Sequence, residues 1–341
     1  MKYSRKGYII VAILSGMLAL LFDSRTALNG ASEGIDLCIR TVIPSLFPFF
    51  LLSSLLTSVI SGAKSPLLKP LGKLCKIPDG SESLLLIGLL GGYPIGAQCI
   101  CNAYESGQIR KSDAQRMLGF CNNAGAAFLF GMVGQFFDSK SAAASLWLIH
   151  IMSALMTAMV LPRSYSDVAI LISEGSTGVG NAMQQSIRAM ANVCGWVVVF
   201  RVILRFLDHW FLWLLPQQWQ VFLFGFLELS NGCLELSVVN SNALRYICAA
   251  VFLAMGGLCV LMQTMSIVNQ SRLGLGMYVP GKIIQTGFSC MLAIPVARLL
   301  YPCESSIPYI AVLISAVIVC ITMIFLRFKE NNSSIPAFTG V

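Results

Sequence analysis

Charge is scarce in this chain of 341 residues. Only 11% of the residues are Asp, Glu, Lys or Arg, whereas 56% are hydrophobic, which is more apolar content than a soluble core can bury. This balance excludes a soluble globular protein and predicts a polytopic membrane protein. The basic excess, 23 Lys and Arg against 15 Asp and Glu, lies in short clusters along the chain. Such clusters are typical of membrane topology, so we expect the lipid bilayer as a partner and no nucleic acid.

Metal-ligating side chains are also scarce. The chain has two histidines, His150 and His209, and its 12 cysteines form no two pairs at zinc-binding spacing. It lacks the paired aspartates of magnesium-dependent prenyl transfer and the His-Glu-x-x-His pattern of intramembrane metalloproteases. We therefore expect no metal site, no cofactor and no enzymatic activity. We expect His150 to be hydrogen-bonded to a neighbouring helix.

The most informative stretch is Gly91-Gly92-Tyr93-Pro94-Ile95-Gly96, inside an apolar segment at residues 84–104. Glycine and proline interrupt a helix, although a backbone within lipid must satisfy its own hydrogen bonds. We interpret residues 84–104 as two half-helices that meet between Gly91 and Gly96 in a re-entrant hairpin. Their exposed ends would hold a polar solute. The alternative is a spanning helix that is kinked for packing.

Three further interruptions follow in predicted membrane segments. Asn122-Asn123-Ala124-Gly125 favours an unwound backbone at the start of a predicted span at 120–137, the alternative being a helix start capped by Asn. The segment at 221–239 has Glu228-Leu229-Ser230-Asn231-Gly232 at its centre. The predicted span at 244–265 contains Gly256-Gly257, which indicate either unwinding or close helix packing.

Glu228 is a carboxylate within a membrane segment, which costs at least about 2.5 to 3.5 kcal/mol at a helix centre. We expect a cation, a proton, or hydrogen bonds from helix N-termini of the opposite hairpin to offset this cost. The alternative is a salt bridge to Arg188 or Arg201.

The same order of features occurs twice along the chain. Each half has a polar approach such as Gly30–Arg40, a bent span, a broken apolar segment, and a span with Gly or Asn near its middle. The predicted division is an N-terminal transmembrane anchor at 1–29, a first repeat at 30–161, a cytoplasmic linker at 162–177, a second repeat at 178–303, and a last helix with a polar tail at 304–341. Basic residues on both flanks of 84–104 place these flanks in the cytoplasm, with both termini. This predicts an all-α membrane protein of about eight transmembrane helices, two re-entrant hairpins and inverted repeats, an arrangement typical of secondary transporters.

These motifs, in this order and spacing, resemble the sporulation integral membrane protein family with the nucleoside-recognition (Gate) domain. The resemblance runs from about residue 30 to residue 326 and is most specific at Gly92-Tyr93-Pro94-Ile95-Gly96-Ala97. The family includes the stage V sporulation transporter of dipicolinic acid. Its Gate domain is similar to concentrative nucleoside transporters, in which two hairpins and two unwound helices enclose the substrate. The resemblance therefore implies a multi-pass transporter in the mother-cell-derived membrane around the forespore.

The chain departs from the family pattern at Gln98, where a basic residue is common, and at Ala126, where a proline is common. Without that cation, the donors that remain for an anion are helix N-termini, Asn122, Asn123 and Ser230.

We therefore expect a secondary carrier of a small planar anion, with dipicolinate as its substrate. A carrier of a nucleoside-like solute is the alternative, and a membrane assembly protein required in sporulation is a rival of another class; a homo-oligomer is compatible with each. The expected substrate-binding residues are Gly91, Gly92, Tyr93, Pro94, Gly96, Asn122, Asn123, Gly125, Ser230, Asn231, Gly232, Gly256 and Gly257. Glu228 and Gln263 are expected to couple or gate transport, with Na⁺ or H⁺ as the coupling ion.

Overall fold

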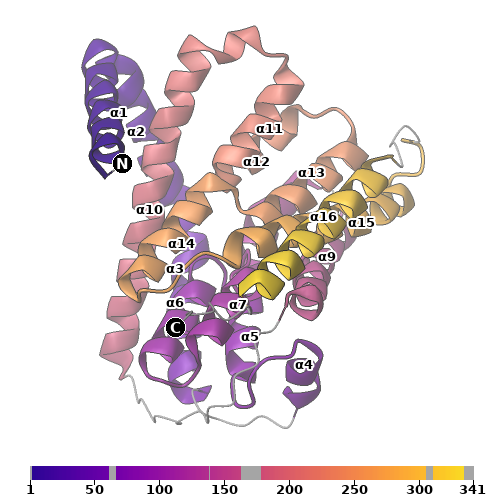
Figure 1. Cartoon of the computed structure of the whole chain (residues 1–341). Helices are drawn as coiled ribbons and strands as arrows, with labels where there is room; N and C mark the ends of the chain where they lie inside the picture. Colours follow the sequence, from indigo (N-terminus) through magenta and orange to yellow (C-terminus); the bar gives the residue numbers. More distant parts are fainter. Residues whose placement is uncertain (1, 61–66, 138, 163–177, 305–309, 334–341) are drawn as a thin grey trace.

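The computed structural model describes residues 2–60, 67–137, 139–162, 178–304 and 310–333, and its regular secondary structure in these ranges is helical (Figure 1). Most of the predicted linker at 162–177 and the end of the predicted tail lie outside the described residues. Five helical stretches are long and apolar enough to cross a membrane, and two shorter apolar stretches lie at Gly7–Phe22 and Ile314–Leu326. The five are Ser24–Leu55, Lys140–Val160, Val179–Trp210, Asn242–Gln270 and Tyr278–Leu300. This confirms a polytopic helical membrane protein; the hairpins' re-entrant course and the inverted repeats stay predictions.

The first layer of the fold consists of the N-terminal helices and α10 (Val179–Trp210). Helix α1 (Lys2–Phe22) lies at its edge, followed by α2 (Ser24–Leu37), which continues through a π-helical turn (Cys38–Val42) into α3 (Ile43–Ile60). The predicted polar approach at Gly30–Arg40 lies in α2 and the π-helical turn, and the predicted boundary at residue 30 falls inside α2. The π-helical turn lies just before the prolines that remove backbone donors from α3.

Two glycines allow α2 to approach α10 closely. Gly30 and Gly34 lie one turn apart, and a Cβ at either would lie 2.9 Å from the Cα of Val202 or Val198 on α10. This Gly-x-x-x-Gly spacing lets two helix backbones pack without side chains between them. The contact holds the polar side chains of α2 against α10.

The second layer is a bundle around α15 (Tyr278–Leu300). Helix α15 packs against α7 (Lys111–Cys121), α9 (Lys140–Val160), α13 (Asn242–Met255) and α16 (Ile310–Ser333). Helices α7 and α15 cross where a Cβ at Gly281 would lie 2.4 Å from the carbonyl oxygen of Gly119. From the sequence, Arg272 and Lys282 predict a cytoplasmic loop before a span that begins at about Ile283. In the structure α15 begins at Tyr278, so Lys282 belongs to this helix and that placement is wrong.

Short helices connect the two layers and contain the interruptions (Figure 1). Among them, α5 and α6 lie in the lower half of the view, and α11 and α12 lie in the upper half. The short helices are α4 (Lys69–Leu74), α5 (Glu82–Leu90), α6 (Ile95–Glu105), α8 (Ala126–Gly131), α11 (Gln217–Leu227), α12 (Leu229–Glu235) and α14 (Gly257–Gln270), with 3-10 turns at Val133–Phe136, Leu212–Leu214 and Leu236–Val238. Each half of the chain thus contributes one pair of short helices and one interrupted longer stretch.

The N-terminus of α13 is capped by a residue that lies beyond α15 in the sequence. The Glu304 carboxylate accepts hydrogen bonds from the Ser241 hydroxyl at 2.5 Å and from the backbone N–H groups of Asn242 and Ala243 at 3.2 and 3.0 Å. These N–H groups have no partner within the helix, and a negative charge is favoured beside them. The Ser241 hydroxyl and the two N–H groups lower the pKa of Glu304 below its usual value.

A carboxyl group whose pKa is lower in the folded state contributes stability above its unfolded pKa of about 4.3, and this contribution is lost as the pH falls through the folded value. We expect Glu304→Gln to destabilise the protein at pH 7 by about 1 kcal/mol, the usual value of a helix cap. The difference from wild type should shrink as the pH falls below about 4. Thermal unfolding of the detergent-purified protein across pH measures both. Glu105→Gln, at the exposed end of α6, is the control; an equal loss in both variants would contradict the capping role.

Candidate functional site

All four predicted interruptions are present in the structure. Helix α5 ends at Leu90 and α6 begins at Ile95, so the first break is slightly shorter than predicted and Gly96 already lies in α6. Asn122 and Gly125 have extended backbones between α7 and α8, and Glu228 is extended between α11 and α12. Gly256 and Gly257 have φ angles of +77° and +76° between α13 and α14, a left-handed conformation that favours glycine. A continuous kinked helix at 84–104 and an Asn cap on α8 are therefore wrong.

The first two breaks fit into each other. A Cβ at Gly88 or Gly96 would lie 2.1 or 2.0 Å from the carbonyl oxygen of Cys121, so α7 ends between α5 and α6. Asn122 Oδ1 accepts a hydrogen bond from the Ala97 backbone N–H at 3.3 Å. Asn123 Nδ2 donates to the carbonyl oxygens of Gly88 and Phe120 at 3.2 and 2.7 Å. The two asparagines thus satisfy backbone groups that the breaks release.

His150 satisfies a further backbone group of the second break. Its Nε2 atom accepts a hydrogen bond from the Ala124 backbone N–H at 3.1 Å. This intramembrane histidine is hydrogen-bonded as predicted, although its partner lies in the unwound stretch between α7 and α8 and not in a helix.

The other two breaks fit together in the same manner. A Cβ at Gly232 of α12 would lie 2.2 Å from the Cα of Gly225 of α11, so these two helices touch backbone to backbone. A Cβ at Gly257 would lie 3.1 to 3.4 Å from the last carbonyl oxygens of α11, at Gly225, Phe226 and Leu227. The first residue of α14 therefore sits against the end of α11.

Tyr93 joins the two pairs of breaks. Its hydroxyl group donates a hydrogen bond to the Leu253 carbonyl oxygen on α13 at 3.3 Å. A Cβ at Gly256 would lie 3.2 Å from Cζ of the Tyr93 ring. On its other side, a Cβ at Gly92 would lie 3.0 Å from the Cα of Gly125. All four interruptions therefore meet around one buried tyrosine.

Glu228 is buried, with 2% of its surface exposed, and is satisfied within its own break. The carboxylate accepts hydrogen bonds from the backbone N–H groups of Ser230 and Asn231 at 3.0 and 2.7 Å and from Asn231 Nδ2 at 2.7 Å. It therefore caps α12, and the donors come from its own hairpin and not from the opposite one as predicted. The alternative of a direct salt bridge is wrong, because Arg201 pairs with Glu33 and Arg188 is exposed.

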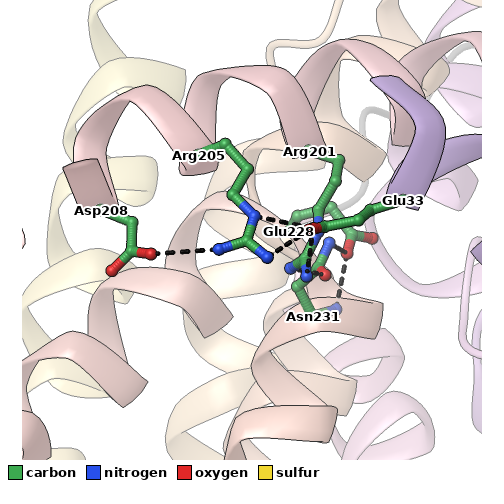
Figure 2. Close-up of polar contacts among 6 residues, drawn as sticks. All are labelled: Glu33, Arg201, Arg205, Asp208, Glu228 and Asn231. Carbon is green, nitrogen blue, oxygen red and sulfur yellow. Dashed lines mark hydrogen bonds and ion pairs between the residues drawn. The ribbon is translucent and has the colours of Figure 1, made fainter. Parts of the chain in front are cut away.

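Asn231 connects Glu228 to ion pairs between α2 and α10 (Figure 2). Its Oδ1 accepts a hydrogen bond from Arg201 Nη1 at 2.5 Å, and Arg201 Nε donates to Glu33 at 2.9 Å. Arg205 also pairs with Glu33, and its Nη1 contacts Asp208 at 3.3 Å. Neither Glu33 nor Arg205 was predicted from the sequence as a site residue. Two features of the sequence could have predicted the ion pairs. Glu33 stands next to Gly34 of the Gly-x-x-x-Gly pair, and Arg201 and Arg205 lie four residues apart in an apolar helix.

Lys282 is a third residue of the site that was not predicted from the sequence. It is 5% exposed, and its Nζ donates to Gln285 Oε1 at 2.7 Å, to the Tyr93 hydroxyl at 3.1 Å and to Asn123 Oδ1 at 3.4 Å. Nζ also lies 5.0 Å from the centre of the Tyr93 ring. Among the described residues, no Asp or Glu oxygen lies within the 4.0 Å of an ion pair. The sequence feature that could have indicated a buried lysine is the position of Lys282 in an apolar stretch, three residues before Gln285.

A small cavity, with a volume of about 40 Å³, lies between α3 and α10 of the first layer and the short helices α8, α12 and α14. Five of the predicted site residues line it: Tyr93, Gly125, Glu228, Ser230 and Gln263. The remaining walls are mostly apolar side chains of α3, α8, α10 and α14. A buried water occupies roughly 10 to 15 Å³ on this scale, so the cavity has room for about three waters or a bare ion. Within the described ranges, no three His, Cys, Asp or Glu side chains lie close enough to hold a metal ion.

The other predicted site residues do not line this cavity. Asn122 donates to the Thr264 hydroxyl on α14 at 2.9 Å, and Asn123 and Asn231 make the contacts given above. Gly91, Gly92, Pro94, Gly96, Gly232, Gly256 and Gly257 shape the breaks and the close contacts between them.

Comparison with known proteins gives one relative. The chain is 24% identical over 217 residues to the sporulation integral membrane protein YlbJ of Bacillus subtilis (strain 168). The alignment covers 54% of this chain and 52% of that protein, so the chain spans about half the length of the relative it matches. No family model matches the chain, and no solved structure matches it. The similarity and the apolar helices support a membrane location and a sporulation-related membrane protein.

The backbone contact between α11 and α12 leaves no room for a side chain at residue 232. A methyl group there would overlap the backbone of Gly225, so we expect Gly232→Ala to lower the free energy of unfolding by about 1 to 3 kcal/mol. Gly195 of α10 has nothing within 4 Å of an added Cβ, and Gly195→Ala should be neutral or stabilising by up to about 1 kcal/mol. Thermal unfolding in detergent compares the two. Equal stability of both variants would show that the two half-helices are not in backbone contact.

Proposed function

We propose that the protein is a secondary carrier that moves a small planar anion, dipicolinate, across the membrane around the forespore. The observation that carries the proposal is the buried Lys282 beside Tyr93 and Asn123, residues of two different breaks. The relative's description as a sporulation integral membrane protein supports the setting.

The chemistry of Lys282 favours an anion. A buried ammonium group is costly unless it is paired, and its neighbours here are neutral oxygen atoms of Tyr93, Asn123 and Gln285. A carboxylate of the substrate would supply the missing negative charge through a charge-assisted hydrogen bond. Lys282 thus provides the cation that the family pattern places near Gln98. The N-terminal ends of α6 and α14 lie at breaks, and both ends also favour a negative group.

Glu228 is suited to couple transport to an ion. The carboxylate accepts three hydrogen bonds and holds the start of α12 in place. Protonation would turn one carboxylate oxygen into a donor and cost it at least one of these bonds, whereas a bound Na⁺ would compete with Asn231 Nδ2 for the same oxygen. Either event would release the break between α11 and α12. Gln263 lines the same cavity and offers an amide oxygen to the ion.

The breaks are the points at which groups of helices can move relative to one another. Broken helices at a central site allow one group of helices to rock against another, so that the site opens to each side in turn. The small cavity, of about 40 Å³, is too small for a pyridine ring, so binding requires the layers around Tyr93 to separate or the ring to lie elsewhere. We assign the first layer, α2, α3 and α10, as the scaffold and the helices around α15 as the group that moves.

Uptake of labelled dipicolinate into liposomes that contain the purified protein tests the proposal. We expect saturable uptake that uridine leaves unchanged. Lys282→Met should lower uptake at least tenfold, because removing one partner of a buried charged contact costs about 2 kcal/mol or more. Lys140→Met removes an exposed lysine at the start of α9 and should behave as wild type. Glu228→Gln should retain dipicolinate binding and lose the dependence on the ion gradient.

Other outcomes would contradict parts of this proposal. Uptake of uridine without dipicolinate would replace the substrate by a nucleoside-like solute. Uptake of neither solute, with stoichiometric co-purification of another membrane protein, would favour an assembly role. In a sporulating host without its own transporter, normal spore dipicolinate in both Glu228→Gln and Asn123→Ala would remove these residues from the mechanism.

A further inference from the structure

A second, larger cavity, with a volume of about 530 Å³, opens at the surface of the bundle. Phe226, Ile283 and Ile318 of its lining are exposed there. It is formed by α11, α13, α14, α15 and α16, and Lys282 lies on its wall. Most of its lining is apolar, including Phe226, Met255, Leu258, Leu261, Ile283 and Ile318. Its volume is within the range of about 300 to 1,000 Å³ that is usual for small-molecule sites.

The polar groups of this cavity are few and mostly occupied. The Thr286 hydroxyl donates to the Lys282 carbonyl oxygen at 2.7 Å, and the Tyr278 hydroxyl accepts a hydrogen bond from Thr264 at 3.4 Å. Lys282 is the charged residue of the lining, and its Nζ lies 6.0 Å from the centre of the Tyr278 ring. The cavity thus combines one cation with an extended apolar surface.

We infer that this cavity holds the transported solute, and that the solute is a carboxylate on an apolar aromatic body. The inference deepens the proposed function and rests on it for the statement that the bound solute is carried. The carboxylate lies at Lys282 Nζ, and the ring lies against the apolar side chains of α14 and α16. The small cavity at Glu228, which has room only for waters or an ion, is then the ion compartment.

The same lining disfavours a nucleoside. Each sugar hydroxyl group that enters an apolar cavity without a partner costs about 1 to 3 kcal/mol, and a nucleoside brings several. An aromatic carboxylate such as benzoate has its polar atoms at one edge, where Lys282 lies, and gains by removing its ring from water. Dipicolinate has a second carboxylate, which in this arrangement faces the open side of the cavity. The cavity therefore selects solutes by the position of their charge and by the absence of hydroxyl groups elsewhere.

Calorimetric binding to the detergent-purified, full-length protein tests the inference, with dipicolinate, benzoate, uridine and palmitate as probes. We expect dipicolinate and benzoate to bind and uridine not to bind. Thr286→Phe places a ring one turn from Lys282 inside the cavity and should weaken dipicolinate binding at least tenfold. Thr322 has the same hydrogen bond to its own helix and is not among the residues of either cavity, so Thr322→Phe should bind as wild type.

A second variant, Ile318→Trp, keeps the test informative if Thr286→Phe does not fold. Ile318 lines the cavity from α16 and is 44% exposed, so Ile318→Trp is accommodated at the edge of the helix while it narrows the cavity. Ile321 is 61% exposed on the same helix, outside both linings, and Ile321→Trp is its control. Loss of dipicolinate binding in Ile318→Trp but not in Ile321→Trp supports the inference.

The outcomes separate the inference from the proposed function. If Lys282→Met abolishes dipicolinate binding but Thr286→Phe and Ile318→Trp leave it intact, the inference is overturned, because the solute then lies on the Tyr93 side of Lys282. The proposed function would stand. Binding of palmitate alone would overturn it in favour of a lipid site. If Thr286→Phe and Ile318→Trp abolish dipicolinate binding, but the wild-type protein shows no uptake in liposomes, the cavity is supported as the binding site and the proposed transport is overturned.

Discussion

The need of the backbone to satisfy its own hydrogen bonds within a membrane is the constraint on which this structure depends. A broken helix releases N–H and C=O groups that lipid cannot bind. Here each break is covered by another segment: the end of α7 lies against Gly88 and Gly96, and the start of α14 lies against the last carbonyl groups of α11. A Cβ at Gly88 or Gly96 would overlap the Cys121 carbonyl oxygen, and Gly257 has a φ angle of +76°, which favours glycine. The breaks are therefore tolerated as interlocking pairs.

Two buried charged residues, Glu228 and Lys282, have different kinds of partners. The carboxylate of Glu228 receives N–H donors from its own helix start and is linked through Asn231 to the ion pair of Arg201 and Glu33. Lys282 receives only neutral acceptors among the described residues. The negative charge is thus part of a network that includes two arginines, whereas the positive charge has no carboxylate partner among the described residues. This difference, more than the glycine motifs, is the basis of the proposed anion site.

The four interruptions could be predicted from sequence because their causes are local. Gly92, Pro94, Gly256 and the asparagine pair at 122–123 act on the helix that contains them, whatever surrounds it. The partners of Glu228 could not be predicted, because a carboxylate gives no sign of which donors reach it. Lys282 was misplaced since a charge-based rule assigns a lysine near a helix start to a loop. Only the packing of α15 against α7, through Gly281 and Gly119, carries that lysine inside the protein.

The two pairs of breaks are held by different layers, and this gives the contact between them a specific role. Asn231 ties the break at Glu228 to Arg201 on α10, whereas Lys282 on α15 holds Tyr93 and Asn123 of the first two breaks. Tyr93 in turn reaches α13 through Leu253 and Gly256. Tyr93 is therefore tied to the second layer, because its hydroxyl group contacts both Lys282 on α15 and Leu253 on α13. If a ligand carboxylate took the place of the Tyr93 hydroxyl group at Lys282, Tyr93 would lose one of these two contacts, and the proposed ligand binding would then loosen the first two breaks from the second layer.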